Sequence, residues 1–440
     1  MIKYPSRITK TYILKLSIPI FFSNLAIPLV GLVDTGLMGN LENQKFLAAT
    51  SIATSVITMI FWSFGFLRMG TVGLVAQALG RGDYREIVLT TVRNLLIALL
   101  VALIIIASKD YIIYLIEHFF RTSNELQYLI NQYISVRVFS APAELTLYVL
   151  IGLYLGIQKT NISSLLIIFF CITNIIFSSF FVLSMKLEIY GVALGTVASS
   201  YLTASIFLAS SYFFIKKHFK VIPRFTRLLV LRKKMLKLFT INFNIFIRTI
   251  LLTFSFLWIT YQSSKLGEEY LAVNTILMQF VIVAAFFLDA YAFSTEGIVG
   301  FTIGRKAQKS FLQAVSNSFK LSFFTGLIIS VLYLLFFKLL INALTGLEYI
   351  RFLSYGFAFW IILIPPIASF CYQLDGIFIG ASQTTEIRNS MIVSVILFIL
   401  FSNFLTYNLN NHGLWLSLVF FMIFRSITLN FYFAKILKKF

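Results

Sequence analysis

Residues 18–39 of the chain have the sequence IPIFFSNLAIPLVGLVDTGLMG, with Asp34 as the one charged side chain. A bilayer core is about 30 Å thick, so a helix that crosses it needs about 20 mostly apolar residues. This stretch therefore predicts a first membrane-spanning helix. In all, twelve such stretches can be marked, near 13–38, 47–75, 88–108, 129–157, 161–185, 189–215, 236–264, 270–298, 311–341, 350–380, 387–408 and 413–434.

The composition of the whole chain agrees with a membrane protein. The 440 residues are 59% hydrophobic and 12% charged, whereas a soluble domain is about half apolar and a quarter charged. A soluble enzyme is therefore excluded. We expect an all-α integral membrane protein with twelve transmembrane helices.

The basic residues are unevenly distributed along the chain. Lys and Arg number 36 against 16 Asp and Glu, for a net charge of +20. With the N-terminus placed inside, 24 basic residues fall in cytoplasmic segments, seven in external loops and five within spans. Cytoplasmic loops of membrane proteins carry this excess of Lys and Arg. The pattern favours twelve spans with both termini cytoplasmic, and it explains the basic balance without a nucleic acid partner.

The two halves of the chain resemble each other at an offset of 224 residues. GTVGLVAQALGR at 70–81 matches STEGIVGFTIGR at 294–305, and Gly152 and Gly156 match Gly376 and Gly380. Six spans is an even number, so both copies would have the same orientation, related by a pseudo-two-fold axis along the membrane normal. Transporters built from repeats hold substrate between the halves near the bilayer midplane. A scaffold without a cavity is the alternative.

The repeat predicts three regions: an N-terminal six-helix lobe over 1–215, a basic cytoplasmic linker over 216–237 and a C-terminal six-helix lobe over 238–440. The linker is the longest and most basic loop, KKHFKVIPRFTRLLVLRKKMLK. We expect it to lie against the anionic cytoplasmic leaflet. Binding of a protein partner is the alternative.

Ionisable groups inside spans are costly and usually functional. Asn24, Pro28, Asp34 and Thr35 share about a third of the circumference of the first span, because helix residues advance by about 100° each. Pro19 and Pro28 remove backbone donors and favour bending, which a protonation-driven switch could use. The alternative is that Asp34 merely reaches the outer interface.

Further polar side chains lie in later spans. Span five carries Cys171, Asn174 and Ser178 on one narrow face, a pattern that can also serve simple bonding between helices. Arg137 and Glu144 lie two turns apart on span four, which favours a paired structural role.

Acidic residues also occur in the C-terminal half. Asp289 and Glu296 lie on one face of span eight, where an ion pair with Arg248 or Arg68 competes with a role in coupling. Glu296 and Asp375 lie near helix ends, where a position at the membrane interface is the alternative.

Other chemistries lack their motifs. No G-x-x-x-x-G-K-[ST] phosphate loop occurs, and His118, His218 and His412 are too scattered for a zinc site. Transport energy would then come from an ion gradient, with no metal or other cofactor.

Several stretches resemble the multidrug and toxic compound extrusion (MATE) family, in particular its DinF-like branch. They include residues 18–41, FLRMGTVGLVAQALG at 66–80, GVALGTVASSY at 191–201 and YQLDGIFIGASQTTEIRNSM at 372–391. The resemblance implies a multi-pass secondary antiporter of the bacterial inner membrane, acting as a monomer among membrane lipids. It would export small organic cations or amphipathic compounds in exchange for H⁺ or Na⁺.

The resemblance also implies a cation site in the N-terminal lobe. Asp34 matches the first-span aspartate of the family, Asn174 a span-five asparagine and Thr196 a span-six threonine. Ser178 departs from the pattern, because the branch usually has an Asn-x-x-x-Asp sequence there. Na⁺ could still bind at Asp34 and Asn174, but a single carboxyl group in a desolvated place favours H⁺. In the C-terminal lobe Asp289, Arg248 and Asp375 are candidates for lining the lobe or holding it closed.

Three other functions are weighed against the exporter. A lipid-linked oligosaccharide flippase of the wider superfamily would be expected to need a basic cavity, whereas the five basic residues within spans occur with acidic ones. A lipid-modifying membrane enzyme would need a nucleophile or metal set on its loops, which here are short. The third is the scaffold that transports nothing.

Overall fold

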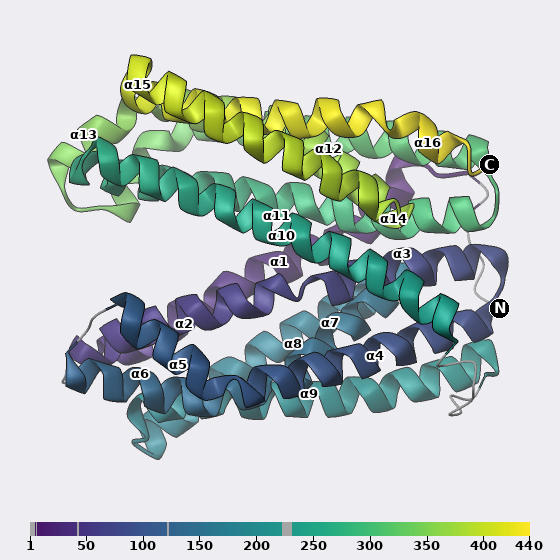
Figure 1. Ribbon diagram of the computed structural model, residues 1–440, viewed down its shortest axis with the longest axis horizontal. Coiled ribbons are helices and arrows are strands. Elements are labelled where there is room, and N and C mark those ends of the chain that lie inside the picture. The colour runs from purple at the N-terminus through teal and green to yellow at the C-terminus, as the bar shows by residue number, and fades with distance from the viewer. Residues whose placement is uncertain (1–4, 6, 42–43, 121–122, 222–230) are drawn as a thin grey trace. The chain divides into compact units, whose positions relative to one another are not determined.

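The computed structural model is built from helices, and no strand occurs in residues 5, 7–41, 44–120, 123–221 and 231–440, the part of the chain that the structure describes (Figure 1). The first half contains α1 Lys10–Gly39, α2 Gln44–Ser63, α3 Phe66–Arg81, α4 Tyr84–Ala107, α5 Lys109–Phe120, α6 Asn124–Arg137, η1 Val138–Ser140, α7 Ala141–Gly156, α8 Thr160–Ser179, η2 Phe180–Ser184 and α9 Glu188–Phe219. The second half contains α10 Arg232–Leu266, α11 Glu268–Gly304, α12 Gln308–Leu344, α13 Glu348–Tyr355, α14 Ala358–Gly380, α15 Thr384–Phe431 and α16 Phe433–Leu437.

The number of membrane-spanning helices agrees with the sequence. In the described residues, 11 helical segments are long and apolar enough to cross a membrane. One of them, Thr384–Leu437, has 54 residues, far more than one crossing requires. Its backbone leaves helical geometry at Asn410, with φ 49° and ψ −134°, so the segment holds two successive spans. The expected all-α, twelve-span fold class is therefore confirmed.

Two helices depart from the predicted spans. Residues 109–120 were expected to be a loop and instead form α5, whose apolar positions fall on one side of the helix. The predicted span over 350–380 is divided, because α13 ends at Tyr355 and α14 starts at Ala358. The apolar content of the sequence did not predict α5 or the end of α13. Both are short helices, which lack the long apolar run of a membrane span.

The helices form two compact units. Of the described residues, those from Phe22 to Phe239 form unit 1, and those up to Phe21 together with Thr240–Phe440 form unit 2. Helix α1 contributes to both, since residues up to Phe21 pack in unit 2 and residues from Phe22 pack in unit 1. The predicted linker 216–237 is helical at both ends, in α9 and α10, while its residues 222–230 lie outside the described part.

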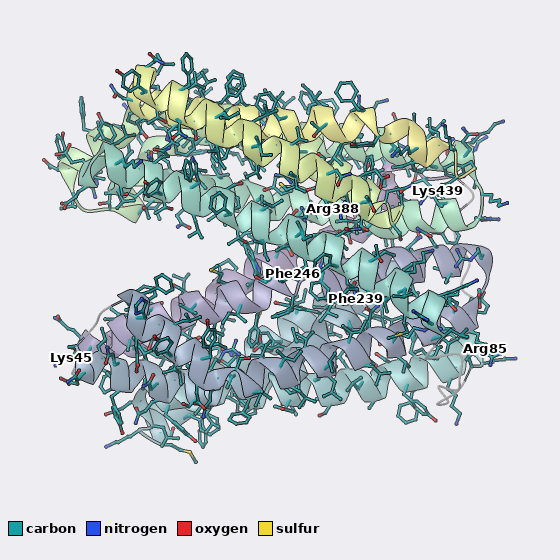
Figure 2. The ribbon with its side chains drawn as sticks, viewed as in Figure 1. Lys45, Arg85, Phe239, Phe246, Arg388 and Lys439 are labelled. Atoms are coloured by element: carbon teal, nitrogen blue, oxygen red, sulfur yellow. The ribbon has the colours of Figure 1, made fainter. Side chains whose placement is uncertain are left out.

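Each unit is organised around one central helix. In unit 1, α7 contacts α3, α4, α8 and α9. In unit 2, α14 contacts α11, α12 and α15. The helices of each unit run lengthwise as a bundle (Figure 1). In Figure 2, Lys45 in the first turn of α2 and Arg85 in the first turn of α4 lie at opposite ends of unit 1, as expected for helices that begin at opposite membrane faces.

The backbone confirms the internal repeat. Helices α2, α4, α6 and α8 begin 224 residues before α11, α12, α13 and α15. Left-handed backbone conformations recur at the same spacing, in the pairs Gly82 and Lys306, Gln158 and Ser382, and Lys186 and Asn410. Non-glycine residues adopt this conformation infrequently, so its recurrence at matched positions shows that the two halves share one fold.

The matched glycines allow the central helices to pack closely. A Cβ on Gly152 of α7 would lie 2.6 Å from the carbonyl oxygen of Arg68 on α3. A Cβ on Gly376 of α14 would lie 2.6 Å from the carbonyl oxygen of Ala292 on α11. Membrane helices associate through such small residues because lipid supplies no hydrophobic driving force between them.

We predict that Gly152→Ala and Gly376→Ala each destabilise the protein by about 1–3 kcal/mol, because the added methyl group would press against backbone. Gly31→Ala on α1 is the control, since a Cβ there has no neighbour within 4 Å. Thermal unfolding of the purified protein in detergent measures the effect. Equal stability of all three variants would contradict the packing argument.

Candidate functional site

Asp34 of α1 is the first element of a polar cluster in unit 1. The side chain is half-buried, and its Oδ1 atom is shielded from solvent without a hydrogen-bond partner among the described residues. The carboxyl group lies beside the Ser178 hydroxyl and within electrostatic reach of Arg137. Asp34 therefore faces the interior of unit 1 through one of its oxygens.

Helices α8 and α9 supply the neutral part of the cluster. Asn174 and Ser178 of α8 are fully buried. Asn174 Nδ2 donates to Thr196 Oγ1 at 3.0 Å and to Ser199 Oγ at 3.4 Å. Its Oδ1 atom, like the Ser178 hydroxyl, has no hydrogen-bond partner in the part of the chain that the structure describes. Buried polar groups are normally paired, so three unsatisfied oxygens of Asp34, Asn174 and Ser178 mark this cluster.

Gly195 brings α8 and α9 together at the cluster. A Cβ at this position would lie 2.6 Å from both the backbone nitrogen and the hydroxyl oxygen of Ser178. The glycine precedes Thr196 and thereby allows the threonine to approach Asn174. Gly195 belongs to the stretch 191–201, but sequence reasoning did not assign it a role.

The equivalent positions in unit 2 are also in contact. At the offset of 224, Asp34 corresponds to Trp258 and Ser178 to Ser402. Trp258 Nε1 donates to Ser402 Oγ at 2.7 Å. The repeated fold therefore brings this helix pair together in both halves, with a carboxyl group in one and an indole in the other.

A half-buried ion pair adjoins the cluster. Arg137 Nη1 lies 2.5 Å from Glu144 Oε1, and Ser200 of α9 donates to the same oxygen at 3.4 Å. The pairing predicted from their spacing is confirmed. Because Glu144 compensates the charge of Arg137, the pair limits how strongly Arg137 can hold Asp34 ionised.

The two prolines of α1 lie inside a continuous helix. Pro19 is half-buried and Pro28 is exposed, and α1 runs through both from Lys10 to Gly39. The change from unit 2 to unit 1 occurs between them, after Phe21. A role for Pro19 and Pro28 in bending stays a prediction.

Unit 2 contains a second buried charge cluster. Asp375 Oδ2 lies 2.6 Å from Arg248 Nη2 and 2.5 Å from Arg425 Nη2. All three residues are buried, so the interfacial alternative for Asp375 is not supported. Arg425 was not predicted as a partner, because contacts between α14 and α15 cannot be read from helical spacing.

Asp289 occupies a neighbouring position on α11. It is half-buried and within electrostatic reach of Tyr372 and Cys371 on α14. Glu296, seven residues later, is buried. The structure thus places Asp289 near Asp375 and its arginine partners, and its contribution to coupling stays a prediction.

The chemistry available in unit 1 is that of a monovalent cation or a proton. Asp34 offers a carboxylate, Asn174 an amide oxygen, and Ser178 and Thr196 offer hydroxyls. Within the described ranges, no three His, Cys, Asp or Glu side chains form a group that could hold a metal ion. A role for these oxygen atoms in binding the coupling ion stays a prediction.

Comparison with known proteins shows the family of the chain. The MatE family profile matches residues 19–180 and 245–433. The chain belongs to the MatE family. Members of this family are transporters and not enzymes, so the expectation that the chain is no enzyme is confirmed.

Individual relatives lie in the same family. The chain is 33% identical over 416 residues to DNA damage-inducible protein F of Escherichia coli (strain K12), covering 94% of this chain and 90% of that protein. It is 20% identical over 236 residues to the multidrug export protein MepA of Staphylococcus saprophyticus, covering 54% of this chain and 52% of that protein. The expected DinF-like relationship is therefore confirmed.

The fold is also that of solved family structures. An outward-facing MATE family multidrug resistance transporter superimposes with a TM-score of 0.88 and 18% identity, covering 98% of this chain and 96% of the other. The predicted all-α fold with membrane-spanning helices is thus the fold of a MatE protein, and the chain is a multi-pass membrane protein.

We predict that Asp375→Asn lowers the free energy of unfolding by about 3–5 kcal/mol, because two buried guanidinium groups would lose their carboxylate. The measurement is chemical or thermal unfolding of the MatE protein in detergent. Asp110→Asn serves as the control, since this carboxylate is exposed and only loosely paired with Lys109 at 3.5 Å. A stability loss no larger than that of the control would show that the cluster is not structural.

Proposed function

We propose that this MatE protein is a secondary antiporter that exports cationic or amphipathic organic compounds in exchange for H⁺. The observation that carries the proposal is the Asp34 carboxyl group among the buried, unsatisfied oxygens of Asn174 and Ser178. Membership of the family supports transport, and the similarity to MepA, a multidrug export protein, supports the class of substrate.

A proton would complete the hydrogen bonding of this cluster. When Asp34 is protonated, one of its oxygens becomes a hydrogen-bond donor. The oxygen of the neighbouring Ser178 hydroxyl can accept that hydrogen bond. When Asp34 is ionised, its charge is only partly balanced, since the nearby Arg137 is paired with Glu144 at 2.5 Å. Ionised Asp34 therefore attracts a cation, and protonation removes that attraction.

This exchange gives the order of events. A cationic substrate binds while Asp34 is ionised, and a proton arriving from outside neutralises Asp34 and weakens the hold on the substrate. Because α1 contributes residues to both units, a change in α1 between Pro19 and Pro28 would accompany the change in charge. Alternating access would follow from this coupling.

Na⁺ is the weaker candidate for the coupling ion. Asp34 and Asn174 could both ligate Na⁺ through oxygen, but Ser178 contributes a neutral hydroxyl in place of a second carboxylate. A single carboxylate attracts a bare cation less strongly than two, because Coulomb attraction scales with charge. A proton needs only the one carboxyl group.

The cellular setting follows from the same proposal. A bacterial exporter of this kind lies in the inner membrane, with its N- and C-termini in the cytoplasm, as the distribution of Lys and Arg predicts. We expect it to act as a monomer surrounded by lipid. The flippase alternative is not favoured, since a flippase is expected to need a basic cavity. The polar cluster of unit 1 is instead built around a carboxyl group.

We expect Asp34→Asn to abolish substrate-dependent proton movement, because asparagine cannot take up and release a proton. The assay is efflux of a fluorescent organic cation from proteoliposomes, with an internal pH dye as the second readout. Asp110→Asn is the matched control, with the same substitution at an exposed site on α5. Full proton-coupled efflux by Asp34→Asn, at wild-type protein levels, would disprove the proposal.

Ser178→Asp is expected to add Na⁺ dependence, because two carboxylates would then face the cation site. Efflux is measured with Na⁺ and pH gradients imposed separately. Ser178→Asn controls for the increase in side-chain volume without the charge. If Ser178→Asp folds but responds to Na⁺ no more than Ser178→Asn does, Ser178 does not determine the choice of ion.

A further inference from the structure

A basic pocket lies in unit 1 where α3 turns into α4, beside the start of α10. Four basic side chains line it: Arg81 of α3, Arg93 of α4, and Lys234 and Lys237 of α10. The acidic residue in its lining is Glu86. The pocket is remote in sequence from the Asp34 cluster and plays no part in the exchange proposed above.

The basic charge of the pocket is only partly neutralised. Glu86 Oε1 lies 3.0 Å from Arg93 Nη1 and 3.3 Å from Lys234 Nζ, so one carboxylate serves two cations. Arg81 and Lys237 make no ion pair with any residue that the structure describes. The pocket therefore has a surplus of positive charge at the end of a bundle of apolar helices.

The remaining lining provides both hydrogen bonds and apolar contact. Gln77 and Thr90 are buried polar residues in the wall. Leu74 and Leu238 line it as well. Arginine, lysine, amide and hydroxyl groups together are the donors that bind phosphate oxygens.

We propose that this pocket binds a phosphate-bearing anion, and specifically the headgroup of an anionic phospholipid. Basic pockets between transmembrane helices near the cytoplasmic face bind such headgroups. The acyl chains of a lipid could also pack against α4, since Leu96, Leu99 and Leu100 are exposed farther along this helix. A free phosphate would leave that surface unused.

Binding would join three helices at one end of unit 1. The phosphate would contact α3 through Arg81, α4 through Arg93 and the first turns of α10 through Lys237. Figure 2 labels Arg85 in the first turn of α4 and Phe239, the last residue of unit 1, on α10. Because α10 continues into unit 2, the lipid would hold the first turns of α10 against α3 and α4, just before the chain enters unit 2.

The test uses the full chain in detergent, with binding measured by native mass spectrometry. The probes are phosphatidylglycerol, phosphatidylcholine and inorganic phosphate, each titrated separately. The variant is the double substitution Arg81→Gln and Lys237→Gln. Its matched control is Arg232→Gln with Lys233→Gln, which also removes one arginine and one lysine from exposed positions on α10 that do not line the pocket.

We expect the wild type to prefer phosphatidylglycerol over phosphatidylcholine and the pocket variant to bind phosphatidylglycerol about 25-fold more weakly, about fivefold per removed charge. The control should change by less than about twofold, since its charges lie outside the pocket. Saturable binding of inorganic phosphate with the same dependence on Arg81 and Lys237 would support the site and identify free phosphate as its ligand. Equal loss in both double variants, or no preference for the anionic lipid, would overturn the proposal.

Glu86→Gln keeps the test decisive if the double variant fails to fold. Removal of the one acidic lining residue is expected to strengthen phosphatidylglycerol binding about fivefold, since it adds one net positive charge. Unchanged or weaker binding by a folded Glu86→Gln protein would count against the site.

Discussion

The interior of a bilayer offers no hydrogen-bond partners, so polar groups within the spans must be satisfied by the protein itself. Many of the buried polar residues here follow this rule, as Asn274 and Asn411 do with each other. A group of unsatisfied oxygens around a carboxyl group can therefore indicate a place where an ion binds. In unit 1 the unsatisfied oxygens of Asp34, Asn174 and Ser178 occur together where α1, α8 and α9 meet, and this constraint is the basis of the proposed coupling site.

The two halves share a backbone but differ in chemistry. Close packing is maintained in both, since Gly152 approaches α3 as Gly376 approaches α11. The polar side chains diverge: Asp34 corresponds to Trp258, and Asn174 to the fully buried Phe398. Unit 2 instead places its buried charge at Asp375, between two arginines. The fold of each half thus tolerates different functional residues on a common set of turns and helix contacts.

Sequence reasoning predicted the spans and the repeat because both depend on local signals, namely apolar length and the spacing of glycine and proline. It also singled out Asp34 as a candidate, since a lone carboxylate in an apolar run is conspicuous, and the functional role of Asp34 stays a prediction. It missed the role of Gly195 and the second arginine on Asp375, because these depend on which helix faces come together. The short helix α5 and the break before α14 were missed because the proportion of apolar and polar residues does not change noticeably at either place.

The indole at position 258 has a consequence for the energetics of the proposed exchange. Since the second half has Trp258 where the first half has Asp34, duplication of the fold did not duplicate the proton carrier proposed above. One proton entering for each monovalent drug leaving moves no net charge across the membrane. The membrane voltage then does no work on the cycle, and the acidity difference alone, about 1.4 kcal/mol per pH unit, limits how far the compound can be concentrated outside the cell.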